Sequence, residues 1–239
     1  MEKLGIISGM GSQAGAWLFQ RIIDLSSATT DQEYPEIIIH NNSGIPDRTE
    51  AILGRGSSPV AEILKSVKLL NDCGVDRIVM ACMTAYFFHK DVAIYSNATF
   101  IHPLDILKEE LADNYLYKKN VKTIGLIGSS GLLISRLFDD FFEPLGYKVI
   151  SINPQEQEQY FNYPVYQCAK LGIVSNHIKN RFSYQVKVLL DRGADVVVGA
   201  CSEVPLLLDK EACGGGAIDL FELLAKSITD NYHKLRYAT

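Results

Sequence analysis

Two cysteines, Cys82 and Cys201, end the same short phrase at two places in the chain. The phrases are LNDCGVDRIVMAC, which begins at Leu70, and LLDRGADVVVGAC, which begins at Leu189. A thiol is a weak acid and its thiolate is a base. Two such groups on opposite sides of one carbon could remove a proton from one face and return a proton to the other. This general acid–base chemistry would invert a stereocentre.

The repeat predicts equivalent positions for the two cysteines, because 193 − 74 and 201 − 82 give the same separation. Each phrase is typical of the end of an amphipathic helix, a glycine at the C′ position and a short apolar strand. The cysteine then lies at the carboxyl end of that strand, where open α/β sheets bind ligands. A second echo, between KLGIISGMG from Lys3 and TIGLIGSSG from Thr123, indicates two copies of one unit.

A structural role is the alternative for any single cysteine, because thiols are commonly small buried hydrophobes. The equivalent placement of this pair, each followed within two residues by a hydroxyl group (Thr84 and Ser202), favours chemistry instead. The structural interpretation is kept for Cys73, Cys168 and Cys213, which are expected at a helix end, in a loop and in a polar turn.

Further candidates are glycine-rich turns and two cations. The turn GMGSQAG from Gly9 lacks the G-x-G-x-x-G spacing, which favours a cradle for a carboxylate or phosphate over a dinucleotide site, with a counterpart at residues 129–131. Arg48 could clamp a carboxylate with two hydrogen bonds, and Lys170 could act as a point charge. The alternatives are a loop ion pair between Asp47 and Arg48 and a solvated lysine.

The elements that must position these residues alternate along the chain. Strands are expected at residues 4–8, 36–40, 77–82, 123–128, 148–153 and 195–201, and helices at 14–26, 59–73, 104–114, 133–145, 175–192 and 218–237. This alternation predicts an α/β fold of two pseudo-symmetric lobes with parallel sheets and helices on both faces. Two long irregular stretches, 41–59 and 154–166, are expected to be functional because they are long.

The predicted lobes are residues 1–100 and 101–208, with a last helix in 209–239 that crosses back to the first lobe after the glycines at 214–216. The active site is expected in the cleft between the lobes, with Cys82 on one wall and Cys201 on the other.

Composition and charge argue against several classes of binding partner. The chain is 47% hydrophobic and carries a net charge of −5, which gives no broad attraction to nucleic acid or to a membrane surface. The longest apolar run, 78–88, is too short to span a bilayer, and we expect no secretory leader. Five cysteines without a dense framework favour free thiols in the cytoplasm, and the histidines show no zinc-ligand spacing, so no metal is predicted.

The ordered motifs resemble the cofactor-independent aspartate/glutamate racemase family over nearly the whole chain. They are SGMG from Ser8, NSGIPDRT from Asn42, CMTAY from Cys82, YQCAK from Tyr166 and ACSE from Ala200. The resemblance implies a small-molecule substrate, no pyridoxal phosphate or other cofactor, and a homodimer.

The same resemblance assigns roles to individual residues. Cys82 and Cys201 would be the two bases, Thr84 and Ser202 would hold the α-amino and α-carboxylate groups, and Arg48 and Lys170 would receive the side-chain carboxylate of an acidic amino acid. The predicted substrate-binding set is completed by three residues at the turns and beside the first cysteine: Met10, Ser129 and Met83.

Two departures from the family pattern leave the substrate open. Met83 stands where the family usually has Asn, and Tyr86 stands where it usually has His. A thioether removes a hydrogen bond to the substrate and adds apolar surface. The alternatives to a racemase of acidic amino acids are therefore a related isomerase, decarboxylase or cyclase, a thiol nucleophile acting on a less polar substrate, or a non-catalytic protein that binds dicarboxylates.

Overall fold

The computed structural model describes residues 2–112, 121–209 and 216–237. They form two compact units, Met1–Pro103 with Glu222–Thr239, and Leu104–Phe221. Cys213, the glycines at 214 and 215 and the last two residues of the helix expected at 104–114 lie outside the described residues. Each unit is an α/β layer structure around a parallel sheet of four strands.

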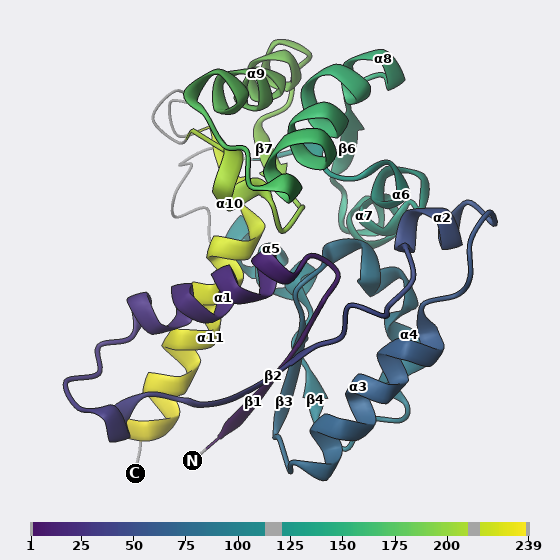
Figure 1. Ribbon diagram of the computed structural model, residues 1–239. Helices are drawn as coiled ribbons and strands as arrows, with labels where there is room; N and C mark the ends of the chain where they lie inside the picture. The colour runs from purple at the N-terminus through teal and green to yellow at the C-terminus, as the bar shows by residue number, and fades with distance from the viewer. Residues whose placement is uncertain (1, 113–120, 210–215, 238–239) are drawn as a thin grey trace. The chain divides into compact units, whose positions relative to one another are not determined.

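The first unit is built on a sheet with the order β2-β1-β3-β4. Figure 1 shows α1 and α11 on one side of this sheet and α3 and α4 on the other. Each of α1, α3 and α11 buries an apolar stripe on the sheet, so the core lies on both faces. The elements are β1 (Lys3–Ser8), α1 (Ser12–Leu25), β2 (Glu36–Asn41), α2 (Arg48–Ile52), α3 (Val60–Asp72), β3 (Arg77–Met80), α4 (His89–Ala93), β4 (Thr99–Phe100) and α11 (Leu220–Tyr237).

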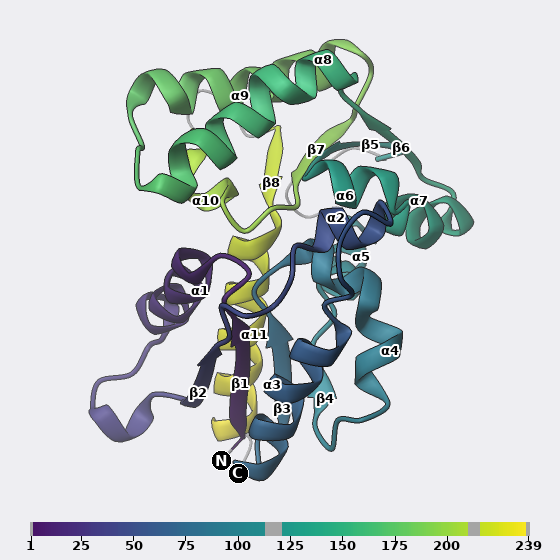
Figure 2. The same cartoon turned by 45° about the vertical axis from the view of Figure 1, so that its right-hand side comes forward.

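The second unit repeats this plan with the strand order β6-β5-β7-β8. In Figure 2, α8 and α9 lie over one side of its sheet and α6 and α7 along the other. The elements are α5 (Pro103–Ala112), β5 (Thr123–Ile127), α6 (Ser130–Ile134), α7 (Leu137–Phe142), β6 (Lys148–Ser151), α8 (Pro154–Glu156), a π-helix (Gln157–Cys168), α9 (Asn176–Asp191), β7 (Val196–Gly199), α10 (Val204–Leu207) and β8 (Ala217–Asp219). The predicted α/β fold with parallel sheets is confirmed.

In each unit, a repeated aspartate joins the starts of the two inner strands of the sheet. The Asp76 carboxylate accepts from the backbone N–H of Lys3 at 2.7 Å, and the Asp195 carboxylate accepts from that of Thr123 at 2.8 Å. In return, each aspartate's own N–H donates to the carbonyl of the same partner at 2.9 Å. These paired bonds set the register of β1 against β3 and of β5 against β7.

The repeated leucines explain two glycines in the strands. Leu70 is fully buried on α3, and a Cβ atom placed on Gly5 of β1 would approach its side chain to 2.9 Å. Leu189 lies on Gly125 of β5 in the same way, with a corresponding approach of 3.0 Å. Because glycine has no side chain at these two points, each helix packs directly on the backbone of its sheet.

The repeated Gly74 and Gly193 confirm the predicted helix ends. Both have positive φ, 66° and 93°, directly after the C-cap residues of α3 and α9. This left-handed conformation is strained for residues with a Cβ atom, so glycine ends each helix and turns the chain into the next strand.

The structure differs from the predicted elements mainly in the second unit. The helix expected at 133–145 is broken, because Arg136 adopts a left-handed φ of 55° between α6 and α7. The stretch 154–166, predicted to be irregular, is helical as α8 and the π-helix. An Asn153–Glu156 capping box with Pro154 in the first turn begins it, which the sequence could have revealed. The π-helix that follows was not predicted, because it contains Pro164, a residue that normally interrupts helices.

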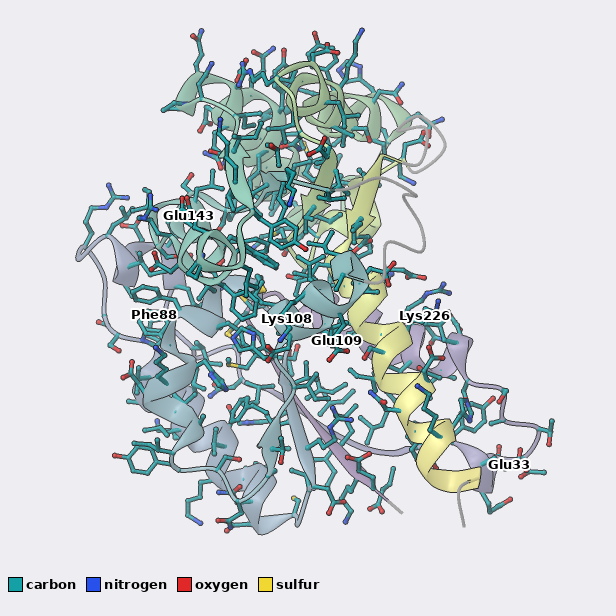
Figure 3. The ribbon with its side chains drawn as sticks, turned by 180° about the vertical axis from the view of Figure 1, so that it is seen from behind. Glu33, Phe88, Lys108, Glu109, Glu143 and Lys226 are labelled. Carbon is teal, nitrogen blue, oxygen red and sulfur yellow. The ribbon has the colours of Figure 1, made fainter. Side chains whose placement is uncertain are left out.

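Two short strands were missed, because β4 and β8 have too few residues to show a period. Residues 217–219 form β8, which pairs with β7, whereas the sequence prediction began the last helix at residue 218. The outer faces of the helices carry charged side chains, such as the exposed Lys226 on α11 in Figure 3.

The contact of Leu70 with Gly5 predicts a large loss of stability for Leu70→Ala. Removing this buried side chain leaves a cavity between α3 and β1, and we expect the free energy of unfolding to fall by about 2–5 kcal/mol. Its neighbour Leu69 is 39% exposed and provides the control, since Leu69→Ala should change that free energy by less than about 1 kcal/mol. Urea unfolding followed by circular dichroism measures both, and equal losses would contradict the role given to the helix–glycine contact.

Candidate active site

Each paired cysteine follows the carboxyl end of a central strand by two residues. The backbone N–H of Ala81 donates to β1 at 2.9 Å, and that of Ala200 donates to β5 at 2.7 Å. The parallel ladder therefore continues to the residue directly before Cys82 and directly before Cys201. Both sulfur atoms are therefore carried on backbone that directly follows an inner strand pair.

Residues after Cys82 form a buried 3₁₀ segment, Met83–Phe88. Cys82, Met83 and Thr84 are consecutive and all buried. Met83 is only 1% exposed, so its thioether is packed inside the unit. The helix α2, which begins at Arg48, packs against this segment. The predicted residue Arg48 and the predicted residues that follow Cys82 are therefore on neighbouring elements.

Tyr86 is a structural tie in this segment. Its hydroxyl accepts from the backbone N–H of Met80 at 3.1 Å and donates to the carbonyl of Ile101 at 2.8 Å. The ring lies edge-on to His102, with 4.9 Å between the centroids. Burial raises the pKa of this phenol well above its usual value, so the hydroxyl stays protonated. Tyr86 thus joins β3 to the chain that follows β4.

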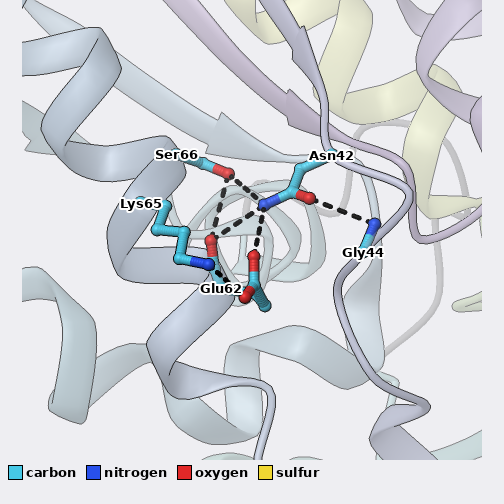
Figure 4. A network of polar contacts seen from close by, with 5 residues as sticks. All are labelled: Asn42, Gly44, Glu62, Lys65 and Ser66. Atoms are coloured by element: carbon cyan, nitrogen blue, oxygen red, sulfur yellow. Dashed lines mark hydrogen bonds and ion pairs between the residues drawn. The ribbon is translucent and has the colours of Figure 1, made fainter.

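The loop that carries Arg48 is held by an amide network around Asn42 (Figure 4). The Asn42 side chain donates to the carbonyl of Glu62 at 3.0 Å and to the hydroxyl of Ser66 at 3.3 Å, and it accepts from the N–H of Gly44 at 3.1 Å. Gly9 has a φ of 92°, and a Cβ atom there would lie 2.2 Å from the backbone of Asn42. The loops after β1 and β2 are therefore in direct contact.

Arg48 links these two loops. Its guanidinium donates to the carbonyl of Pro46 at 3.0 Å and to that of Met10 at 2.9 Å. The neighbouring Asp47 caps α2, since its carboxylate accepts from the N–H of Glu50 at 2.9 Å. The structure therefore brings the predicted residues Met10 and Arg48 together, through the backbone of Met10.

Three of the predicted residues of the second unit converge on Glu203, a carboxylate that is 5% exposed. The Cys201 thiol donates to it at 2.9 Å and the Ser202 hydroxyl at 3.2 Å. The Lys170 ammonium lies 3.6 Å from its other oxygen and 4.9 Å from the ring centroid of Tyr166. Lys170 is thus paired and 30% exposed.

Glu203 belongs to the ACSE motif, but no role for it was predicted from the sequence. The available signal was its position: in the repeat it corresponds to Thr84, two residues after the cysteine, so a charge replaces a hydroxyl there. Burial raises the pKa of the Cys201 thiol well above its usual value, and the adjacent Glu203 charge raises it further. At neutral pH this group is a thiol and can donate a proton.

Ser129, predicted to bind substrate, caps α6. Its hydroxyl accepts from the N–H of Leu132 at 3.1 Å. The turn beside it is held by Gln157 of the π-helix, which donates to the carbonyl of Gly128 at 2.8 Å. Cys168, expected in a loop, instead ends the π-helix and is buried in the core of this unit, so the loop assignment is wrong.

The described residues contain no group of three or more His, Cys, Asp or Glu side chains that could hold a metal ion. Across the same part of the chain, no helix is long and apolar enough to cross a membrane.

The family model for Asp/Glu/hydantoin racemase matches residues 7–227. The chain belongs to the Asp/Glu/hydantoin racemase family. This family member is 23% identical over 235 residues to the broad specificity amino-acid racemase RacX of Bacillus subtilis strain 168, covering 96% of this chain and 97% of that protein.

Solved structures share the fold of this racemase-family chain. The aspartate racemase of Picrophilus torridus is similar with a TM-score of 0.77 and 23% identity, covering 98% of this chain and 95% of that one. An aspartate racemase homologue from Pyrococcus horikoshii OT3 is similar with a TM-score of 0.74 and 21% identity, covering 98% of this chain and all (100%) of that one. Its named relatives are racemases, so the chain is a member of a family of isomerases.

The two hydrogen bonds of Tyr86 predict that Tyr86→Phe destabilises the fold. Deleting the hydroxyl removes the partner of a buried carbonyl, and we expect the free energy of unfolding to fall by about 1–3 kcal/mol. Tyr95 is 61% exposed in the same unit, and Tyr95→Phe serves as the matched control with little expected change. Thermal and urea unfolding measure the difference. A Tyr86→Phe protein as stable as the control would show that these two hydrogen bonds do not contribute to the free energy of unfolding.

Proposed function

We propose that the protein is an amino-acid racemase that inverts the α-carbon of an acidic amino acid by two-base proton transfer through Cys82 and Cys201, without a cofactor. The observation that carries this proposal is the equivalent placement of the two thiols, each two residues beyond the central strand of its own sheet. Family membership supports the reaction class. On the same family grounds we propose a homodimer that works in the cytoplasm.

In the proposed reaction the substrate's α-carbon lies between the two sulfur atoms. The thiolate of one cysteine takes the α-proton, and the thiol of the other gives its proton to the opposite face of the same carbon. One proton leaves the carbon and one arrives, so the product differs only in handedness. Without a cofactor, the carbanion must be stabilised by groups of the protein around the substrate, where Thr84 and Ser202 are the residues proposed to hold the α-amino and α-carboxylate groups.

Arg48 and Lys170 are the proposed partners of the substrate's side-chain carboxylate. The guanidinium of Arg48 has its plane fixed by two carbonyls, those of Met10 and Pro46, which carry no formal charge. A planar guanidinium oriented in this way suits a carboxylate of the substrate with matched geometry. Lys170 already faces Glu203, so a substrate carboxylate there would share the ammonium.

A racemase with a wider substrate range is the second candidate. The Glu203 carboxylate offsets the charge of Lys170, which weakens the electrostatic demand for an acidic side chain. The relative from Bacillus subtilis is named a broad specificity racemase. Tyr86, the second departure from the family pattern, does not favour a changed substrate, because its buried hydroxyl is hydrogen-bonded to the backbone. Neutral amino acids therefore belong in any substrate test.

The two-base proposal predicts that Cys82→Ala and Cys201→Ala each lower the rate of racemisation by roughly 10²–10⁴-fold, because each removes a positioned acid or base. The measurement follows loss of the α-proton signal of L- and D-aspartate and glutamate in deuterated water by NMR, with chiral analysis of the product. Cys73→Ala, at the C-cap of α3, is the control and should keep the wild-type rate. Wild-type exchange in both Cys82 and Cys201 variants would reject the mechanism.

The Arg48 proposal predicts a change of preference between aspartate and its neutral analogue asparagine. We expect Arg48→Met to lower the ratio of kcat/KM for aspartate over asparagine by about tenfold or more, because the charge-assisted bond to the carboxylate is lost. Loosening of the loop affects both substrates and cancels in the ratio. Arg55→Met, which removes an exposed arginine paired with Glu50, should leave the ratio unchanged. An unchanged ratio in Arg48→Met would favour the wider range instead.

A further inference from the structure

We propose that Glu203 is a positioning residue that holds the Cys201 sulfur as the protonated member of the cysteine pair and directs its S–H bond. This inference rests on the proposed function in taking Cys201 as one of the two proton-transferring thiols. Its own basis is a geometry in which one buried carboxylate receives the thiol, the neighbouring hydroxyl and an ammonium group.

The direction of the hydrogen bond identifies Cys201 as the donor. A carboxylate oxygen is an acceptor, and at 2.9 Å the Cys201 sulfur can share it only by presenting a hydrogen. A thiolate at that distance would place two negative charges side by side. The Ser202 hydroxyl shares the same oxygen at 3.2 Å, which further orients the carboxylate toward this thiol.

The balance of charge around the sulfur also favours the thiol. Among the described residues, two charged groups act on the Cys201 sulfur, Glu203 from the segment after β7 and Lys170 from the 3₁₀ turn Ala169–Leu171. Their charges cancel as a pair, so a Cys201 thiolate would be one extra negative charge beside them. Because the carboxylate lies at hydrogen-bond distance from the sulfur and acts on it more strongly than the ammonium does, the protonated thiol is favoured, as the raised pKa of Cys201 also indicates.

The surroundings of the two cysteines differ between the units. At the position of Glu203, the first unit has Thr84, which carries no charge. The repeated backbone therefore carries the two cysteines alike, while the side chains two residues later make their surroundings different. In the proposed reaction, Cys201 begins as the acid and Cys82 as the base. After the transfer, Cys82 carries the α-proton and the Cys201 thiolate faces Glu203. Once the product has left, Cys82 releases its proton to water and Cys201 takes one from water, which returns the pair to its starting state.

The test measures the ionisation of Cys201 directly by its alkylation with iodoacetamide, since only the thiolate reacts. Peptide mass spectrometry follows the modification of each cysteine across a range of pH. Glu203→Gln removes the charge that opposes the thiolate, so the pH midpoint for Cys201 should move down by about one unit or more. At a fixed pH below both midpoints, alkylation should then be about tenfold faster than in the wild type.

Lys170→Met provides the opposite change. Removal of the cation leaves Glu203 unbalanced and disfavours the thiolate, so the Cys201 midpoint should move up. Loss of folding cannot imitate this pair of results, because unfolding would bring the Cys201 midpoint down toward its ordinary value in both variants. Glu156→Gln is the matched control: it removes a carboxylate of the same unit that pairs with Arg192, and it should leave the midpoint unchanged.

A Cys201 midpoint that stays at the wild-type value in Glu203→Gln, or that moves in the same direction in both variants, overturns the role of Glu203. The readout needs no turnover and so separates the two proposals. Opposite shifts in a protein that exchanges no α-proton would support the role of Glu203 and reject the racemase. Cysteine-dependent exchange with unmoved midpoints would support the racemase and reject the role of Glu203.

Discussion

The parallel pairing of the two inner strands is the constraint on which each unit depends. An aspartate fixes the start of the pair from both sides, with bonds of 2.7–2.9 Å in the first unit and 2.8–2.9 Å in the second. A buried leucine presses the preceding helix onto a strand glycine, and a second glycine with positive φ ends that helix. Together these features set where the strand stops, and therefore where its cysteine lies.

The same backbone carries different chemistry in the two units. After Cys82 come a packed thioether and a hydroxyl, and after Cys201 come a hydroxyl and the buried carboxylate Glu203. A repeated fold supplies two similar positions, and the side chains two residues after each cysteine differ in charge. Beside Cys201, the charge of the buried Glu203 raises the pKa of the thiol without altering the strands.

Most of the fold followed from pattern. The six longer strands have clear apolar runs, and the helices α3 and α9 end at the glycines that the repeat exposed. The π-helix was missed because Pro164 lies inside it and its apolar residues follow no 3.6-residue period, although the Asn153 capping box marked the beginning of α8 directly before it. The break at Arg136 was missed because a left-handed residue other than glycine has no reliable signal.

The sequence by itself determined the α/β repeat, the equivalence of Cys82 and Cys201 and the racemase family, because periodicity, turn residues and ordered motifs are local and legible along the chain. Only the tertiary structure decided that the Tyr86 hydroxyl binds backbone, that Arg48 bridges two loops, and that Lys170 and Cys201 meet on Glu203. The reason is physical. A hydrogen bond or ion pair joins residues that folding brings together across the sequence, and its effect on charge depends on distance and burial, which no spacing records.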